Sequence, residues 1–269
     1  MKNERLVSVL IPCFNHEQYV KECLDSIEQN LYKNLEYVII NDGSTDNSHD
    51  EILDWINFNP ELKVNYINRE NRGLSKTLNQ LISLANGEYI CIIASDDNLT
   101  KNSIKLRVDS LESNPAKYVA IGDTFVIDSY GAVLMQSCIE ELWKGDKNRY
   151  LSDYGLMYSV VKEWSVPGPS MLARKSVYDI IGMYPEDLLC EDLNFYLQVF
   201  GRKLAVFVPE NVAFYRIHLT NTSRKPELKK ELLKSIVRSY LNNIKYYDLR
   251  LKLAIIKRIL GNLKLYLFT

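Results

Sequence analysis

The chain has 269 residues, of which 46% are hydrophobic and 11% aromatic, and its 33 Lys and Arg nearly balance its 34 Asp and Glu. This length allows a substantial core, and the aromatic content argues against disorder. No apolar run approaches the roughly 20 residues of a membrane-spanning helix, and the run at residues 7–11 is too short for a signal peptide. We therefore expect a protein that is neither secreted, collagenous nor integral to a membrane.

The net charge of −1 hides an uneven distribution. Residues 224–269 carry 12 Lys and Arg against 3 Asp and Glu, a balance of +9, so residues 1–223 carry −10. This predicts an acidic body with a basic tail. The five cysteines include no C-x-x-C pair and lie among apolar residues. They favour reduced core thiols in a cytoplasmic protein over a zinc site or disulfides.

The first hundred residues alternate between strand and helix patterns. Apolar runs predict strands at residues 7–11, 35–40, 62–67 and 89–94, with a helical pattern after each of the first three. The last run is almost continuously apolar, which predicts a central strand. This order predicts right-handed crossovers and the α/β class, with a mostly parallel central sheet flanked by helices and a Rossmann-like nucleotide-binding half.

Beyond residue 100 the patterns are weaker, and residues 137–166 follow none that we can interpret. Helices are predicted at residues 104–113 and 192–200, and strands at 119–127, 132–135 and 204–208. After Pro226, two basic amphipathic helices are predicted at about 227–247 and 249–267.

Polar or turn-forming residues follow each of the first four predicted strands, at residues 12–15, 41–46, 68–73 and 95–98. Ligands bind beyond the carboxyl ends of parallel strands, so these segments predict a ligand crevice. Neither a G-x-G-x-x-G loop nor a P-loop accompanies it, because Ser75 stands before Lys76 where a P-loop has Gly. Phosphate groups bound there would need another partner, such as a carboxylate-bound metal.

Two acidic motifs lie in this crevice, and each has two interpretations. The adjacent carboxylates of Asp96 and Asp97 repel each other unless a cation bridges them, but Asp and Asn also suit a helix N-terminal cap. Asn41-Asp42-Gly43 suits either a turn or recognition of a base N–H by Asp42. Taken alone, neither motif decides between structure and function.

Together, five motifs resemble one family over residues 6–125, at residues 7–15, 41–46, 71–75, 85–90 and 95–97. In order and spacing they are similar to the nucleotide-sugar-dependent family 2 glycosyltransferases, which have the GT-A fold. The resemblance implies inverting transfer of a sugar from a nucleotide sugar, with UDP favoured, to a hydroxyl of a glycan or lipid-linked acceptor, in bacterial surface polysaccharide synthesis. It continues less tightly to about residue 223. The implied organisation is a GT-A catalytic domain at 1–223, with a nucleotide-binding half at 1–125 and an acceptor and sugar half at 126–223, followed by the tail at 224–269.

The same resemblance assigns residues to the nucleotide. Phe14 stands where the family usually has Tyr and keeps an aromatic face for stacking. Asp42 would accept the imide N–H of uracil, and Arg72 would contact the base or diphosphate. The full set of implied nucleotide-binding residues is Pro12, Phe14, Asn15, Asp42, Arg72 and Asp96.

A metal and a general base are implied as well. The second carboxylate of the family's D-x-D pattern matches Asp96, followed by Asp97, but the first falls on Ala94, which leaves open whether Asp96 or Asp97 holds the metal. His218 matches a metal or diphosphate ligand of the family, with a structural hydrogen bond as the alternative. The implied cofactor is Mn²⁺ or Mg²⁺, bound by Asp97, Asp96 and His218. His16 and His49 lie in patterns typical of a helix surface.

The acidic pair of Glu191 and Asp192 opens a predicted helix, where the family places its general base. We favour Asp192 as the group that takes the proton of the acceptor hydroxyl; the alternative is that both acids only favour a helix N-terminus. Two other functions stay open: a nucleotidyltransferase of sugar activation, and a catalytically inactive nucleotide-sugar-binding module.

An apolar stripe along the basic tail predicts a partner surface. A membrane surface is favoured, which would place the protein peripherally on the cytoplasmic face of the inner membrane. The body of the protein or a second subunit of a homo-oligomer is the alternative, and no nucleic-acid partner is expected. The stripe consists of Leu232, Ile236, Tyr240, Ile244, Leu253, Ile256, Ile259, Leu260 and Leu263.

Overall fold

The computed structural model of the protein describes residues 4–218 and 228–268. The predicted boundary between body and tail at residues 223–224 lies outside the described residues, as does the predicted start of the tail helix at residue 227. Among the described helices, none is both long and apolar enough to cross a bilayer. All five cysteines are buried and free, as the sequence predicts.

One sheet of nine strands extends through the body, in the order β3-β2-β1-β4-β8-β6-β9-β5, with β7 paired to β6. Strands β1 to β4 are parallel neighbours, which confirms the predicted parallel half. The other half is mixed, because β8 runs antiparallel between β4 and β6 while β9 is parallel to β6. The strands are β1 (Val7–Cys13), β2 (Leu35–Asp42), β3 (Val64–Arg69), β4 (Tyr89–Ile92), β5 (Asn98–Leu99), β6 (Val119–Ile127), β7 (Val133–Met135), β8 (Met171–Arg174) and β9 (Ala205–Arg216).

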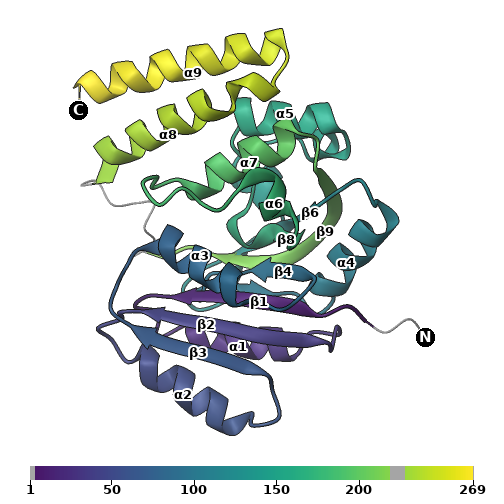
Figure 1. Cartoon of the computed structure of the whole chain (residues 1–269), viewed down its shortest axis with the longest axis vertical. Coiled ribbons are helices and arrows are strands. Elements are labelled where there is room, and N and C mark those ends of the chain that lie inside the picture. The colour runs from purple at the N-terminus through teal and green to yellow at the C-terminus, as the bar shows by residue number, and fades with distance from the viewer. Residues whose placement is uncertain (1–3, 219–227, 269) are drawn as a thin grey trace.

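Helices cover both faces of this sheet (Figure 1). Alternate residues of β1 therefore enter different cores: Val9 packs with α1, α2 and α4, and Leu10 packs with α3, α5 and α7. Burial on both faces explains why the strands are continuous apolar runs. The helices are α1 (Val20–Glu28), α2 (Ser48–Phe58), α3 (Leu74–Leu84), α4 (Ser103–Ser113), α5 (Asp153–Lys162), α6 (Val177–Ile181), α7 (Glu191–Gly201), α8 (Lys229–Asn243) and α9 (Leu249–Phe268).

Two parts of the body differ from the sequence prediction. The segment at residues 137–166, for which the sequence predicts no element, contains a short π-helix at Cys138–Leu142, a 3-10 helix at Lys147–Leu151 and then α5. Strand β9 does not end at Val208 but continues to Arg216, because a register shift opposite Gly122 and Asp123 accommodates the interruption at Pro209. Gly122 is required at this bulge, since a Cβ there would lie 2.5 Å from Val212 Cγ1.

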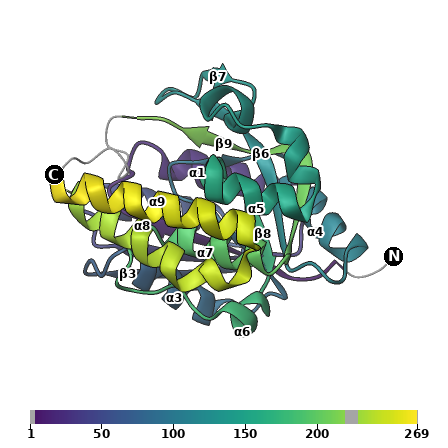
Figure 2. The same ribbon diagram turned by 90° about the horizontal axis from the view of Figure 1, so that it is seen from above.

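The two tail helices lie side by side across α7 and α5, at the end of the molecule farthest from α2 (Figures 1 and 2). The predicted stripe is divided between two environments. Tyr240 and Ile259 are buried in the core of the body, and Leu232, Ile236 and Ile244 pack against it. The remaining residues, Leu253, Ile256, Leu260 and Leu263, are exposed on the outer face of α9.

Candidate active site

Asp42 ends β2 and is buried within a set of donors. Its carboxylate forms an ion pair with the Arg69 guanidinium, and it accepts the backbone N–H groups of Arg72 at 2.9 Å and Gly73 at 3.0 Å. The Arg72 residue is exposed, so its backbone rather than its guanidinium contacts Asp42. Gly43 makes this close packing feasible, because it has a φ of +77° and a Cβ there would lie 2.5 Å from the Asn71 nitrogen. Sequence reasoning missed Arg69.

Pro12, Phe14 and Asn15, at and just after the end of β1, have different surroundings. Pro12 lines a cavity at the sheet's carboxyl edge, whereas Phe14 is 42% exposed. Asn15 adopts a φ of 55°; its N–H donates to Ser44 Oγ and its Oδ1 accepts the Thr45 N–H, both at 2.8 Å. Asn15 therefore ties the loop after β1 to the loop after β2.

Asp96 lies with two histidines at the same edge. Its Oδ2 is 2.9 Å from His218 Nε2 and 3.7 Å from His16 Nε2. The expectation that His16 lies on a helix surface is wrong: it lies in the loop before α1, where its Nδ1 is 2.8 Å from Ser95 Oγ. That contact orients the ring with Nε2 toward Asp96.

These three side chains fit a divalent metal. One potential ligand atom from each, in His16, Asp96 and His218, lies within 4.8 Å of the other two. Burial lowers the pKa of His16, which favours the neutral imidazole that a metal requires. Burial raises the pKa of Asp96, but the hydrogen bond with His218 and the nearby His16 outweigh it, and the net shift is downward. The site therefore offers two imidazoles and one carboxylate.

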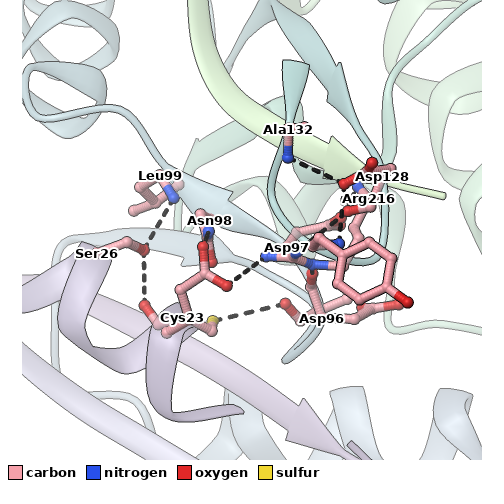
Figure 3. A network of polar contacts seen from close by, with 12 residues as sticks. Cys23, Ser26, Asp96, Asp97, Asn98, Leu99, Asp128, Ala132 and Arg216 are labelled. Carbon is pink, nitrogen blue, oxygen red and sulfur yellow. Dashed lines mark hydrogen bonds and ion pairs between the residues drawn. The ribbon is translucent and has the colours of Figure 1, made fainter. Parts of the chain in front are cut away.

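Asp97 faces a different partner. Figure 3 shows Arg216 lying beside Asp96, Asp97 and Asp128: its backbone N–H donates to Asp97 Oδ1 at 2.8 Å, and its Nε donates to the Asp96 carbonyl at 2.7 Å. Arg216 is fully buried and also pairs with Glu22. Burial and the neighbouring Asp96 raise the pKa of Asp97 well above its ordinary value. The two adjacent aspartates thus have separate environments, one facing histidines and one facing Arg216.

Glu191 and Asp192 form the first turn of α7. Burial raises the pKa of Glu191 to about 8, with a further contribution from the charge of Asp192, and burial also raises the pKa of Asp192. Asp192 Oδ1 accepts the N–H of Leu193 at 2.7 Å. A carboxyl group with a raised pKa is suited to exchange protons near neutral pH.

A cavity of about 220 Å³ brings the predicted groups together. Pro12, Asp96 and Asp97 line it from the carboxyl edge of the sheet, and Glu191 and Asp192 line it from the start of α7. Asn15, His16 and His218 line a neighbouring cavity of about 500 Å³, so the cluster of His16, Asp96 and His218 lies between the two cavities. Phe14, Asp42 and Arg72 line neither cavity.

Solved structures share this fold at low sequence identity. The mannosyltransferase PcManGT from Pyrobaculum calidifontis, in complex with GDP-Man and Mn²⁺, is 17% identical with a TM-score of 0.70, and the match covers 97% of this chain and 72% of that one. The S. aureus TarS 1-349 structure in complex with UDP-GlcNAc is 19% identical with a TM-score of 0.69, covering 95% and 72%. The fold is therefore the GT-A-like α/β fold of glycosyltransferases, as predicted.

The sequence identifies the family within this fold class. Residues 8–161, more than half of the chain, match the model of glycosyl transferase family 2, so the chain belongs to that family. Glycosyltransferase GlyG of Streptococcus pneumoniae serotype 4 is 36% identical over 144 residues, covering 51% of this chain and 47% of GlyG. GlyA of the same organism is 26% identical over 226 residues, covering 81% of this chain and 31% of GlyA. The chain thus spans about half or less of the length of these relatives.

A relative of more similar length is an uncharacterized glycosyltransferase of Haemophilus influenzae, 28% identical over 258 residues, with 91% of this chain and 77% of that one covered. The prediction of a family 2 glycosyltransferase is confirmed at the level of the family. The family match gives no support to the nucleotidyltransferase alternative.

Proposed function

We propose that this protein is an inverting, metal-dependent glycosyltransferase that moves a sugar from a nucleotide sugar to a hydroxyl group. The acceptor is a glycan or a lipid-linked sugar, and the pathway is bacterial surface polysaccharide synthesis. The observation that carries this proposal is the cavity of about 220 Å³, because it joins the carboxylates at the end of the parallel strands to the acidic pair of α7. A donor and the group that activates an acceptor need such proximity.

The donor is a UDP-sugar in this proposal. Asp42 stands at the end of β2 with its carboxylate oriented by the N–H groups of Arg72 and Gly73. A carboxylate so held would accept the imide N–H of uracil, and Phe14 offers an exposed ring for stacking. Two structural neighbours were solved in complex with UDP-GlcNAc and with GDP-Man, which supports a nucleotide-sugar donor without identifying its base. Arg69 is the cation that pairs with Asp42, and the exposed Arg72 guanidinium would contact the base or diphosphate.

Asp96, His218 and His16 would hold the metal. Mg²⁺ takes oxygen ligands, whereas imidazole suits transition metals, so two histidines make Mn²⁺ the better fit of the two predicted ions. Held by these three residues, such an ion would supply positive charge to offset the negative charge of the departing nucleotide diphosphate. Asp97, the other predicted ligand, would hold the Arg216 backbone and thereby fix the position of Asp96.

Asp192 is the proposed general base. It would take the proton of the acceptor hydroxyl while that oxygen attacks the anomeric carbon from the side opposite the nucleotide, which inverts the configuration. The neighbouring Glu191 keeps its proton at neutral pH, because its pKa is raised to about 8. Burial thus raises the pKa of both acids of the pair.

We also propose that residues 1–223 form the catalytic domain and that residues 224–269 attach it to the cytoplasmic face of the inner membrane. The outer face of α9 supports attachment, because exposed apolar residues recur there at helical spacing beside Lys257 and Lys264. They are Leu249, Leu253, Ile256, Leu260, Leu263 and Leu267. An interface with a second subunit is the alternative occupant of this face.

The direct test is a screen of nucleotide sugars for slow hydrolysis by the purified protein, with and without Mn²⁺. The proposal expects one donor, a UDP-sugar, to be hydrolysed in a Mn²⁺-dependent manner. Absence of hydrolysis with every donor, together with tight nucleotide-sugar binding, would favour an inactive binding module instead.

A further inference from the structure

A second cavity adjoins the acidic pair on the side of the tail. It has a volume of about 510 Å³, and it shares Leu74, Glu191 and Asp192 with the smaller cavity. We call it the tail pocket. Its other lining residues are Trp164, Leu189, Cys190, Leu193, Leu228, Leu232, Ile236, Tyr240, Arg258 and Asn262.

The wall that the tail contributes is fixed to the segment around the acidic pair. Ser235 of α8 accepts the backbone N–H of Leu189 at 3.0 Å, and Asn243 Nδ2 donates to Asn194 Oδ1 at 3.0 Å. Helix α9 is attached through Arg258 Nε, which donates to the Val161 carbonyl at 3.2 Å. Hydrogen bonds on both tail helices thus set the width of the pocket, so the tail is a structural part of the site.

The chemistry of the tail pocket differs from that of a sugar site. Leu189, Leu228, Leu232 and Ile236 present aliphatic side chains, and Trp164 adds an aromatic one, whereas polar groups come mainly from Arg258, Asn262 and the acidic pair. Sugar rings require many hydrogen-bonding partners, and an aliphatic wall provides none. The volume is that of a site for a small molecule.

We propose that the tail pocket binds an aliphatic group attached to the acceptor sugar. The acceptor hydroxyl would then lie at Asp192, between the donor's sugar in the smaller cavity and the aliphatic group in the tail pocket. This inference rests on the proposed function, because it requires Glu191 and Asp192 to face the acceptor. It narrows the acceptor class to sugars that carry an apolar aglycone and assigns the tail a role in acceptor selection.

Binding of an aliphatic group in the tail pocket can be tested with matched methyl and octyl glycosides of glucose, galactose and N-acetylglucosamine. The octyl glycosides are used at concentrations below those at which they form micelles. Binding is measured from Trp164 fluorescence in the presence of UDP and Mn²⁺, with Trp164→Phe identifying the signal. Each methylene that enters an apolar site strengthens binding about fourfold, so octyl glycosides should bind at least tenfold more tightly than methyl glycosides. Equal binding of the two series would overturn the proposal.

Substitutions in the tail pocket test whether the octyl group binds there. Ile236→Asn places an amide in the pocket and should remove most of the octyl preference, and Leu232→Ala is a milder change that should remove part of it. Leu241→Asn is the matched control, because Leu241 lies on the same helix but is 56% exposed and outside the pocket. If both pocket variants fold and keep the full preference, the octyl chain binds elsewhere and the proposal is wrong.

Donor hydrolysis separates this inference from the proposed function. The pocket variants should hydrolyse the donor like the wild type, because they leave Asp96 and Asp192 in place. Hydrolysis without any octyl preference would defeat only the tail pocket, whereas the absence of hydrolysis with every donor would defeat the proposed function.

Discussion

The two sides of the acidic pair are built differently. On the proposed donor side, single polar groups such as Asp42 and Asp96 each contact two or three specific partners. On the proposed acceptor side, the tail pocket is lined mainly by apolar side chains. A side that depends on single groups should be sensitive to single substitutions, whereas a side that depends on summed apolar contacts should respond gradually.

The largest effect is expected at the acidic pair itself. Asp192→Asn removes the proton acceptor while keeping the shape of the side chain, so transfer should fall by about 10² to 10⁴-fold. Donor binding should persist, as calorimetry with UDP and Mn²⁺ would show. If Asp192→Asn transfers sugar normally and Glu191→Gln does not, the base is Glu191.

The next effect distinguishes the two adjacent aspartates. Asp96→Asn should lower the Mn²⁺-dependent affinity for UDP by about 10- to 100-fold, because loss of a ligand costs at least as much as loss of a group that supports one. Asp97→Asn keeps an oxygen for the Arg216 N–H and should retain most of the Mn²⁺ dependence. Titrations with the reverse pattern would assign the metal to Asp97.

A third effect is the pH dependence of stability. The folded protein keeps a proton on Glu191 up to a pKa of about 8, whereas its ordinary value is 4.5, so the folded state binds more protons between these values. Stability should therefore fall as the pH rises from about 5 to 8. Glu191→Gln should weaken this decline in thermal denaturation, and an unchanged decline would mean that Glu191 is ionised at neutral pH.

The smallest effects are expected on the outer face of α9. A double substitution of Leu253 and Leu260 by Asn leaves the buried face intact, since both side chains are more than 60% exposed. Co-sedimentation with anionic vesicles should decrease for this variant. Wild-type binding should decrease at high salt, because each basic residue near the surface contributes about 1 kcal/mol.

The vesicle experiment also has a clear negative result. Equal and negligible sedimentation of both forms would exclude the membrane proposal. A change in oligomeric state on the double substitution would then assign the outer face of α9 to contacts between subunits.

The sequence was enough to predict that Asp42 and Asp96 lie at the carboxyl edge of the sheet and that Asp192 lies at the start of α7, but not to predict the lining of the tail pocket. Asp42, Asp96 and Asp192 lie in motifs whose chemistry needs those residue types. The order and spacing of these motifs along the chain were therefore enough to predict a shared site. His16 was missed because its position looked like the surface of a helix, and only the fold brings it to Asp96. Arg69 was missed because its partner Asp42 lies on the neighbouring strand.

The two tail helices show what the periodicity of apolar residues in a sequence cannot predict. The apolar stripe was correctly expected to need a partner, and α8 does pack on the body. The pattern did not show that α9 has two apolar faces, one buried with Leu251 and Ile255 and one exposed with Leu253 and Leu260. A helix that is apolar on opposite faces has no single stripe from which its orientation follows. Trp164 and Leu189 of the tail pocket lie in segments without any motif.

The central claim is an inverting transfer with Asp192 as the base, and proton NMR of donor turnover tests it most directly. The wild-type protein with its preferred α-linked donor and Mn²⁺ should release or transfer the sugar first as the β-anomer, before mutarotation, and Asp192→Asn should produce almost none. Initial release of the α-anomer, or undiminished turnover by Asp192→Asn, would contradict the account.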